Sequence, residues 1–331
     1  MEKDLQMSFK GVEENLAKDI SLVINATLVK LDETLDFRRM HQIIITADFA
    51  KELAELSSAT ASGSDIQHTN EEYAIAVAKV LLFQKDNDLE IVPVINANIA
   101  THLVQPNEEG YQSENFHTVF HLLHHELCHV HDNNKKIDAF PDKILRFRYE
   151  GKDRLIRALA EACWSEYIAN VLSSSSAHEG SINAMGECFS DAIERTKEIF
   201  DKEILDYRYH GDIDRLMSVF ERHGEFLVKS AAYMLGYMEG CQAKLEELYS
   251  QAAERLKGSY FETTWIAMRD ALTKMKQLYP SEWKDLDIYD ELAIAMEDYY
   301  AAMGLILLHT NQDGGLYIDI PFRPETTPPQ I

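Results

Sequence analysis

Apolar residues follow two different spacings along this chain, and past residues 173–176 the spacing is almost wholly that of helices. Before that point, short runs of β-branched and large apolar residues predict strands at 42–46 and 90–95. A short helical pattern at 49–53 follows the first strand. Residues 73–83 and 90–95 flank the polar turn 85–88, and together they predict a β-hairpin. The first part of the chain is therefore expected to contain a small sheet with helices.

One alternative for the hairpin stays open. Thr69 and Glu72 have the spacing of a capping box, which would make the first half of this region a helix instead of a strand.

The rest of the chain has the three- and four-residue apolar spacing that is typical of helices. This pattern predicts helices at 113–131, 155–172, 182–206, 212–257, 262–278 and 286–309. Gly211, Gly258 and Pro280 lie in the breaks between them. Gly236 and Gly240 stand four apart inside one segment, a spacing that in a soluble chain indicates a close helix crossing.

The segment 113–131 carries the most specific motif, His125-Glu126-Leu127-Cys128-His129, which is an HExxH sequence. Ser113 is a plausible N-cap, and the polar run 132–134 is expected to end the helix. Residues four apart in a helix lie about 40° apart around its axis, one turn along, so both imidazoles project toward one point. Glu126 lies on the adjacent flank, where a carboxylate can act as a general base.

Histidine is abundant in this helix, and other pairs have the same spacing. His117/His121 and His121/His125 are also four apart, but only His125/His129 has a glutamate in the required register. His124 and His131 are expected to be exposed or to support the ligands from behind. The sequence therefore predicts that His125 and His129 bind a metal ion.

A catalytic zinc ion needs a third protein ligand, and the helix 155–172 offers Glu161 and Glu166. Glu166 shares a face with small and apolar residues that another helix can approach closely, and Asn170 follows it by one turn. Glu161 has Arg157 one turn before it, which is typical of a solvated ion-pair flank. We therefore expect Glu166 to be the ligand, with Asn170 hydrogen-bonded to a ligand histidine.

These motifs resemble those of the zincin metallopeptidases, in the branch that uses two histidines and a glutamate. The 166–170 segment is similar to the glutamate-x-x-alanine-asparagine pattern of the ImmA/IrrE-like group. The resemblance covers roughly residues 73–172. Thermolysin-like gluzincins have an aspartate where this chain has Asn170, and no third-histidine motif of the metzincin type follows His129.

The resemblance implies a peptidase with Zn²⁺ as cofactor and a peptide or protein substrate. Glu126 would take a proton from water and pass it to the leaving nitrogen. No motif identifies the group that stabilises the oxyanion, and four downstream residues are available for it: Tyr207, Tyr209, His210 and His223. The zincin pattern also implies a cleft-lining edge strand before the metal helix, for which 95–99 is the candidate, against a plain edge strand.

Two other functions were compared with this one. A carboxylate-bridged di-iron protein would use ExxH motifs such as 114–117 and 126–129, but such motifs must stand on different helices and these share one. A zincin-like lobe retained as a non-catalytic zinc-binding regulatory or interaction protein is the second alternative. The intact Glu126 favours catalysis, because a structural site needs no general base.

Composition limits the environment and the partners of the chain. The 331 residues carry 56 acidic and 32 basic side chains, a formal charge of −24, which disfavours nucleic acid and anionic lipid as partners. With no export signal and no long uncharged apolar run, a cytoplasmic location is expected. Four cysteines are too few for a disulfide framework, and Cys128 and Cys163 are expected to pack in the core.

The predicted fold class is α+β. A zincin-like lobe at 1–175, with a small, mostly antiparallel sheet and the HExxH helix, would precede a mainly α-helical lobe at 176–312. Residues 313–331 would form a C-terminal extension that is disordered at its end, where proline and threonine are frequent.

Overall fold

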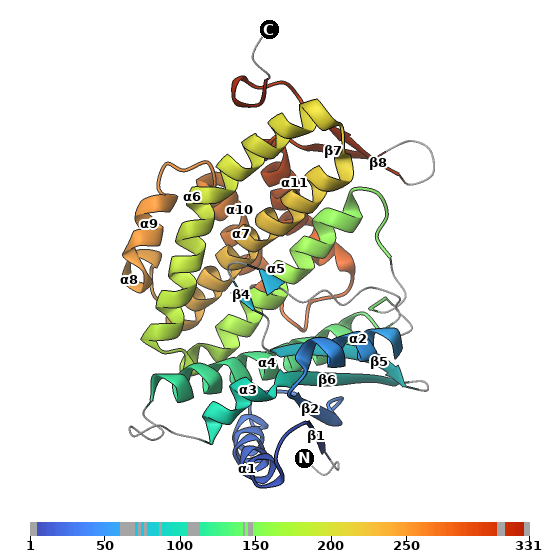
Figure 1. The fold of residues 1–331 in the computed structure, drawn as a ribbon, viewed down its shortest axis with the longest axis vertical. Coiled ribbons are helices and arrows are strands. Elements are labelled where there is room, and N and C mark those ends of the chain that lie inside the picture. The colour runs from blue at the N-terminus through green and yellow to red at the C-terminus, as the bar shows by residue number, and fades with distance from the viewer. Residues whose placement is uncertain are drawn as a thin grey trace. The chain divides into compact units, whose positions relative to one another are not determined.

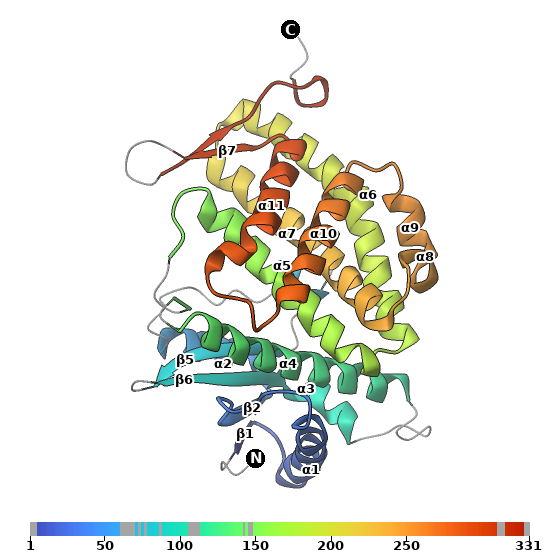
Figure 2. The same ribbon diagram turned by 180° about the vertical axis from the view of Figure 1, so that it is seen from behind.

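The computed structural model describes residues 5–59, 70–71, 74–75, 78–85, 88–104, 113–141, 143–144, 148–309 and 315–327. The chain, shown in Figures 1 and 2, divides into two compact units. The first consists of Met1–Pro141 and Leu172–Ser181, and the second of Asp142–Val171 and Ile182–Ile331. Each unit therefore combines separate stretches of the chain, and the segments expected from the sequence were 1–175, 176–312 and 313–331.

A four-stranded sheet forms the centre of the first unit. Its strands are β1 (Gln6–Lys10), β2 (Gln42–Thr46), β5 (Ala78–Lys85) and β6 (Asp88–Asn96), in the order β1-β2-β6-β5. The pairs β1–β2 and β2–β6 are parallel, and β5–β6 is the antiparallel hairpin predicted from the sequence. The sheet is therefore mixed, and the expectation of a mostly antiparallel sheet is wrong. Short strands β3 (Asn70–Glu71) and β4 (Ala74–Ile75) pair separately.

The predicted edge strand at 95–99 is also wrong. Ile95 and Asn96 end β6, which lies between β2 and β5, and residues from Ala97 onward form the short helix α3 (Ala97–Ala100). Strand β5 is the edge on that side of the sheet. The capping-box alternative rested on Thr69 and Glu72, which lie outside the described residues.

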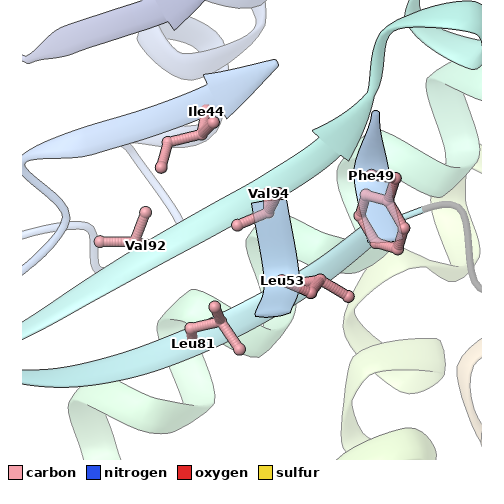
Figure 3. Close-up of a cluster of buried hydrophobic side chains, with 6 residues drawn as sticks. All are labelled: Ile44, Phe49, Leu53, Leu81, Val92 and Val94. Atoms are coloured by element: carbon pink, nitrogen blue, oxygen red, sulfur yellow. The ribbon is translucent and has the colours of Figure 1, made fainter. Parts of the chain in front are cut away.

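Part of the core of this unit lies between the sheet and helix α2 (Phe49–Ala59), as Figure 3 shows. Val92 and Val94 stand two apart on β6, as side chains on one face of a sheet do. The cluster consists of Ile44, Phe49, Leu53, Leu81, Val92 and Val94, each at most 6% exposed. The packing of these apolar side chains stabilises the strands against which the HExxH helix lies.

Helix α4 (Glu114–Ala139) carries the HExxH motif and packs against β5 and β6 (Figure 2). Ser113 caps it as predicted, accepting a hydrogen bond from the Phe116 N–H at 3.2 Å. The predicted stop at 132–134 is wrong, because the helix continues through these residues. Asp132 is buried beside Lys136 at 2.6 Å, and the Asn134 amide donates to the Asp36 carbonyl at 2.9 Å. These polar residues therefore form contacts within the folded chain instead of ending the helix.

The first unit also contains α1 (Glu14–Leu31) and two 3₁₀ turns, η1 (Thr101–Leu103) and η3 (Ser174–Ser176). Turn η3 belongs to the returning segment Leu172–Ser181 and contacts α4.

The second unit is mainly helical. Its elements are α5 (Asp153–Ser173), α6 (Glu179–His210), α7 (Ile213–Cys241), α8 (Leu245–Leu248), α9 (Ser250–Leu256), α10 (Glu262–Leu278) and α11 (Asp290–Met303). Turns η4 (Leu286–Tyr289) and η5 (Pro324–Thr326) and the hairpin of β7 (Ile306–His309) with β8 (Leu316–Asp319) complete it. Buried aromatic rings hold the helices together, for example Phe200 stacked on Phe220 with ring centroids 3.8 Å apart.

Three sequence predictions for this unit are corrected. The segment 212–257 is not one helix, because α7 ends at Cys241 and Gln242 takes a left-handed conformation with φ 54°. The predicted helix 286–309 ends at Met303, and residues 306–309 form β7 instead. Within the predicted disordered end, Arg323 is fixed by hydrogen bonds to the Ala301 and Ala302 carbonyls.

The close helix crossing predicted at Gly236 is confirmed. A Cβ at this position of α7 would lie 2.6 Å from the Tyr167 carbonyl oxygen and 2.7 Å from the Asn170 Cβ, both on α5. Only a glycine allows the two helices to approach this closely. None of the helices in the described part of the chain is long and apolar enough to cross a membrane.

Candidate metal centre

The two histidines of the HExxH motif converge as their spacing predicts. The Nε2 atoms of His125 and His129 are 3.0 Å apart, and their rings stand nearly perpendicular, at 88°. Two nitrogen ligands of one tetrahedral zinc ion would be separated by roughly 3.3 Å, given zinc–nitrogen bonds of about 2.0–2.1 Å. A hydrogen bond between two neutral imidazoles fits the same distance. The two nitrogens therefore lie close enough together to bind the same metal ion.

Glu126 lies next to this pair in a protected position. His125 is 4% exposed and Glu126 7% exposed, while His129 is half-buried. Glu126 directly follows His125 on the same helix. A carboxylate beside two metal ligands could take a proton from a metal-bound water molecule.

Cys128, within the same motif, is a buried thiol. It is fully buried, and burial, followed by the charges of Glu126 and Asp132, raises the pKa of Cys128 far above its usual range. The prediction that Cys128 packs in the core is confirmed, and the same holds for the fully buried Cys163.

His121 and His124 are both held by Ser176, a residue that the sequence did not single out. Their Nδ1 atoms lie 2.9 and 2.8 Å from the Ser176 Oγ, which in turn donates to the Ser173 carbonyl at 2.9 Å. His124 is 5% exposed, so it is not one of the surface histidines that the sequence allowed for. Ser176 appeared in the sequence only as part of a serine run.

His131 also has a definite structural contact. Its Nδ1 accepts a hydrogen bond from the Asp36 N–H at 2.8 Å, which ties α4 to the segment after α1. Of the residues considered for the oxyanion, Tyr209 is 67% exposed, and the His210 Nδ1 accepts from the Asp212 N–H at 2.8 Å. The structure assigns none of them a catalytic role.

Glu161 and Glu166 occupy different surroundings on α5, within the second unit. The Tyr149 hydroxyl donates to the Glu161 carboxylate, and Arg157 forms ion pairs with Asp153 and Asp290. Glu161 thus has a definite structural partner in Tyr149. This contact supports the choice of Glu166 over Glu161 as a ligand.

Glu166 lies near a cationic side chain of α7. Burial acts to lower the pKa of Lys229, but the carboxylate of Glu225, 2.9 Å away, outweighs it, and Glu166 adds to the increase. The side-chain amide of Asn170 donates to the Glu166 main-chain carbonyl at 2.9 Å. The Asn170 Oδ1 is buried and accepts no hydrogen bond from the residues that the structure describes.

Comparison with protein-family models, with curated proteins and with solved structures finds no match to this chain.

Proposed function

We propose that this protein is a zinc-dependent metallopeptidase in which His125, His129 and Glu166 hold the ion. The observation that carries the proposal is the convergence of the two imidazole Nε2 atoms beside a buried glutamate. Glu166 would supply the third donor, a carboxylate oxygen, from α5. Two imidazoles and one carboxylate are a common catalytic zinc set, which leaves a position open.

The chain's own residues would divide the work of peptide hydrolysis. A bound zinc ion polarises the substrate carbonyl and makes a water molecule more acidic. The Glu126 carboxylate accepts a proton from that water and donates it to the nitrogen of the departing amine. His125 and His129 fix the position of the reaction, because both extend from the same rigid helix that carries Glu126.

A non-catalytic zinc-binding or interaction protein is the second candidate. The observation that favours it is the charge of Lys229 on α7. Its ammonium pairs with Glu225 at 2.9 Å and also interacts with the charge of Glu166, so Glu166 has a cation nearby without a metal ion. In that case the histidine pair would bind zinc weakly or with a ligand from a partner. The two candidates differ in whether the zinc-loaded protein cleaves peptides.

Exchange of Glu126 for Gln tests the catalytic role. We expect the variant to retain its zinc, as measured by elemental analysis, because Glu126 is not a ligand. Cleavage of a synthetic peptide pool, followed by mass spectrometry, should fall by about 10²- to 10⁴-fold, the usual effect of losing a general base. Glu14→Gln, at an exposed position on α1, is the matched control and should cleave normally. Unchanged cleavage by Glu126→Gln contradicts the mechanism, and a zinc-loaded wild type that cleaves nothing supports the non-catalytic candidate.

The ligand choice is tested separately. Glu166→Ala should weaken zinc binding in equilibrium dialysis far more than Glu161→Ala, because only Glu166 is proposed to contact the ion. The opposite order would exclude Glu166 as the third ligand.

A further inference from the structure

A second group of metal-ligand side chains lies at the beginning of α4, within the first unit. Glu114 and His117 are three residues apart on this helix, so they share a face. His178, from the returning segment Leu172–Ser181, lies beside them. The ring centroids of His117 and His178 are 5.9 Å apart, with an angle of 36° between the rings.

Gly180 leaves the space in which these side chains meet. A Cβ at this position would lie 2.5 Å from the Glu114 Oε1 and 2.9 Å from the His178 Nε2. Both potential ligand atoms therefore point into the same small volume, which any other residue type would fill. Glu114 is exposed and the two imidazoles are half-buried, so the space is open to ions from solution.

His178 is held in the way that ligand histidines usually are. Its Nδ1 lies 2.9 Å from the Ser181 Oγ, and its Nε2 lies beside the same open position as the Glu114 Oε1. This hydrogen bond orients the ring, and with the hydrogen on Nδ1 the Nε2 is available to bind a metal ion. The Thr118 hydroxyl, at 3.5 Å from the Nε2, is a weak competitor.

We propose that Glu114, His117 and His178 form a second site for a divalent transition-metal ion such as zinc, separate from the HExxH residues. Two imidazoles and one carboxylate suit zinc, nickel or copper better than calcium or magnesium. Among the residues that the structure describes, the three ligand atoms do not all lie within 4.8 Å of one another. The three side chains must therefore move closer together on binding, and this reorganisation makes the site weaker than a preformed one.

Zinc titration of the full-length, metal-free protein by calorimetry tests the proposal. We expect two binding events in the wild type. His125→Gln/His129→Gln should retain the weaker event, and His117→Gln/His178→Gln should lose it and keep the tighter one. His41→Gln/His102→Gln, which removes two other half-buried histidines, is the matched control and should keep both events. Circular dichroism of each variant confirms that it is folded.

Two outcomes would overturn the proposal. One is a His117→Gln/His178→Gln variant that binds as much zinc as the wild type, and the other is a His125→Gln/His129→Gln variant that binds none. Because the second variant lacks the HExxH histidines, failure of the peptidase proposal does not affect this result.

Milder variants keep the test valid if a double exchange unfolds the protein. Gly180→Ala places a methyl group between Glu114 and His178, and Ser181→Ala removes the hydrogen bond to the His178 Nδ1. We expect each to weaken zinc affinity in the weaker event about tenfold or more, as loss of a supporting contact usually does. The tighter event should be unchanged. An unchanged zinc affinity in the weaker event of both variants contradicts the proposed ligands.

Discussion

Ser176 determines the tautomers of two histidines through one hydroxyl group. A hydroxyl has a single hydrogen, and the Ser176 hydroxyl donates it to the Ser173 carbonyl. Its lone pairs must therefore accept from His121 and His124, so both rings carry their hydrogen on Nδ1. This side chain thus satisfies two buried imidazoles of α4 from the returning segment.

Exchange of Ser176 for Ala should destabilise the protein. Two buried Nδ1–H donors would lose their acceptor, and an unsatisfied buried donor costs about 1–3 kcal/mol. Urea unfolding followed by circular dichroism measures the change in the free energy of unfolding. Ser175→Ala is the matched control, because Ser175 is exposed in the same turn, and its effect should be within about 0.5 kcal/mol. Equal stability of the two variants would argue against the hydrogen-bonded arrangement of Ser176.

The same two histidines should make the metal-free protein sensitive to acid. Burial, followed by the charge of His125, lowers the pKa of His121 to about 3, and the same effects lower the pKa of His124 to about 4. Both rings are neutral in the folded state and bind protons more readily when unfolded, with a pKa of about 6.5. Their stabilising effect is therefore complete above pH 6.5 and is lost as the pH falls.

The loss should reach about 2 kcal/mol for each histidine at pH 5. Urea unfolding of the metal-free protein at several pH values measures it. His121→Asn keeps an N–H donor but does not titrate, so its stability should fall less steeply between pH 6.5 and 4. A variant with the wild-type pH dependence would show that His121 does not contribute.

At the scale of elements, the crossing of α5 and α7 depends on Gly236. Gly236→Ala would bring a Cβ to 2.6 Å from a backbone oxygen, so the helices must separate, and we expect a loss of about 1–3 kcal/mol or more. Gly224→Ala is the matched control on the same helix. There a Cβ would meet the Phe200 ring at 3.1 Å, and the higher helix propensity of alanine offsets the contact. Comparable thermal unfolding of both variants would contradict the close crossing.

Local patterns predicted most elements but not how they end or pair. The helices at 113–131 and 155–172 were correctly predicted because their apolar stripes are long and regular. The end of α4 was not, since Asp132 and Asn134 are polar residues whose partners, Lys136 and Asp36, appear only in the folded chain. The apolar three- and four-residue spacing likewise continues past Met303, where α11 ends. It therefore did not reveal that residues 306–309 form β7.

Strand pairing was predicted only where it is local. The β5–β6 hairpin follows from the turn between two apolar runs, but the parallel partners β1 and β2 are separated by α1. Such a pairing leaves no short-range signal in the sequence. The candidate site shows the same limit: the spacing of His125 and His129 predicted their convergence, whereas nothing near Ser176 or His178 in the sequence indicated a contact with α4.

At the scale of the whole molecule, charge is the most distinctive property. The formal charge of −24 gives the protein a negative field that attracts cations and basic segments and repels polyanions. A negative field also increases the local concentration of metal ions, which assists both proposed sites. The peptidase proposal is compatible with a preference for basic substrates.

The path of the chain between the two compact units determines how this protein can be divided. The chain passes from one unit to the other at residues 141–142, 171–172 and 181–182, so neither unit is a continuous stretch of sequence. A fragment that stops at residue 141 would include the whole HExxH helix but lack Ser176 and His178. Shortening the gene from either end therefore cannot yield the intact histidine-rich unit. Joining residue 141 to residue 172 through a designed linker is the kind of rearrangement that isolating it would require.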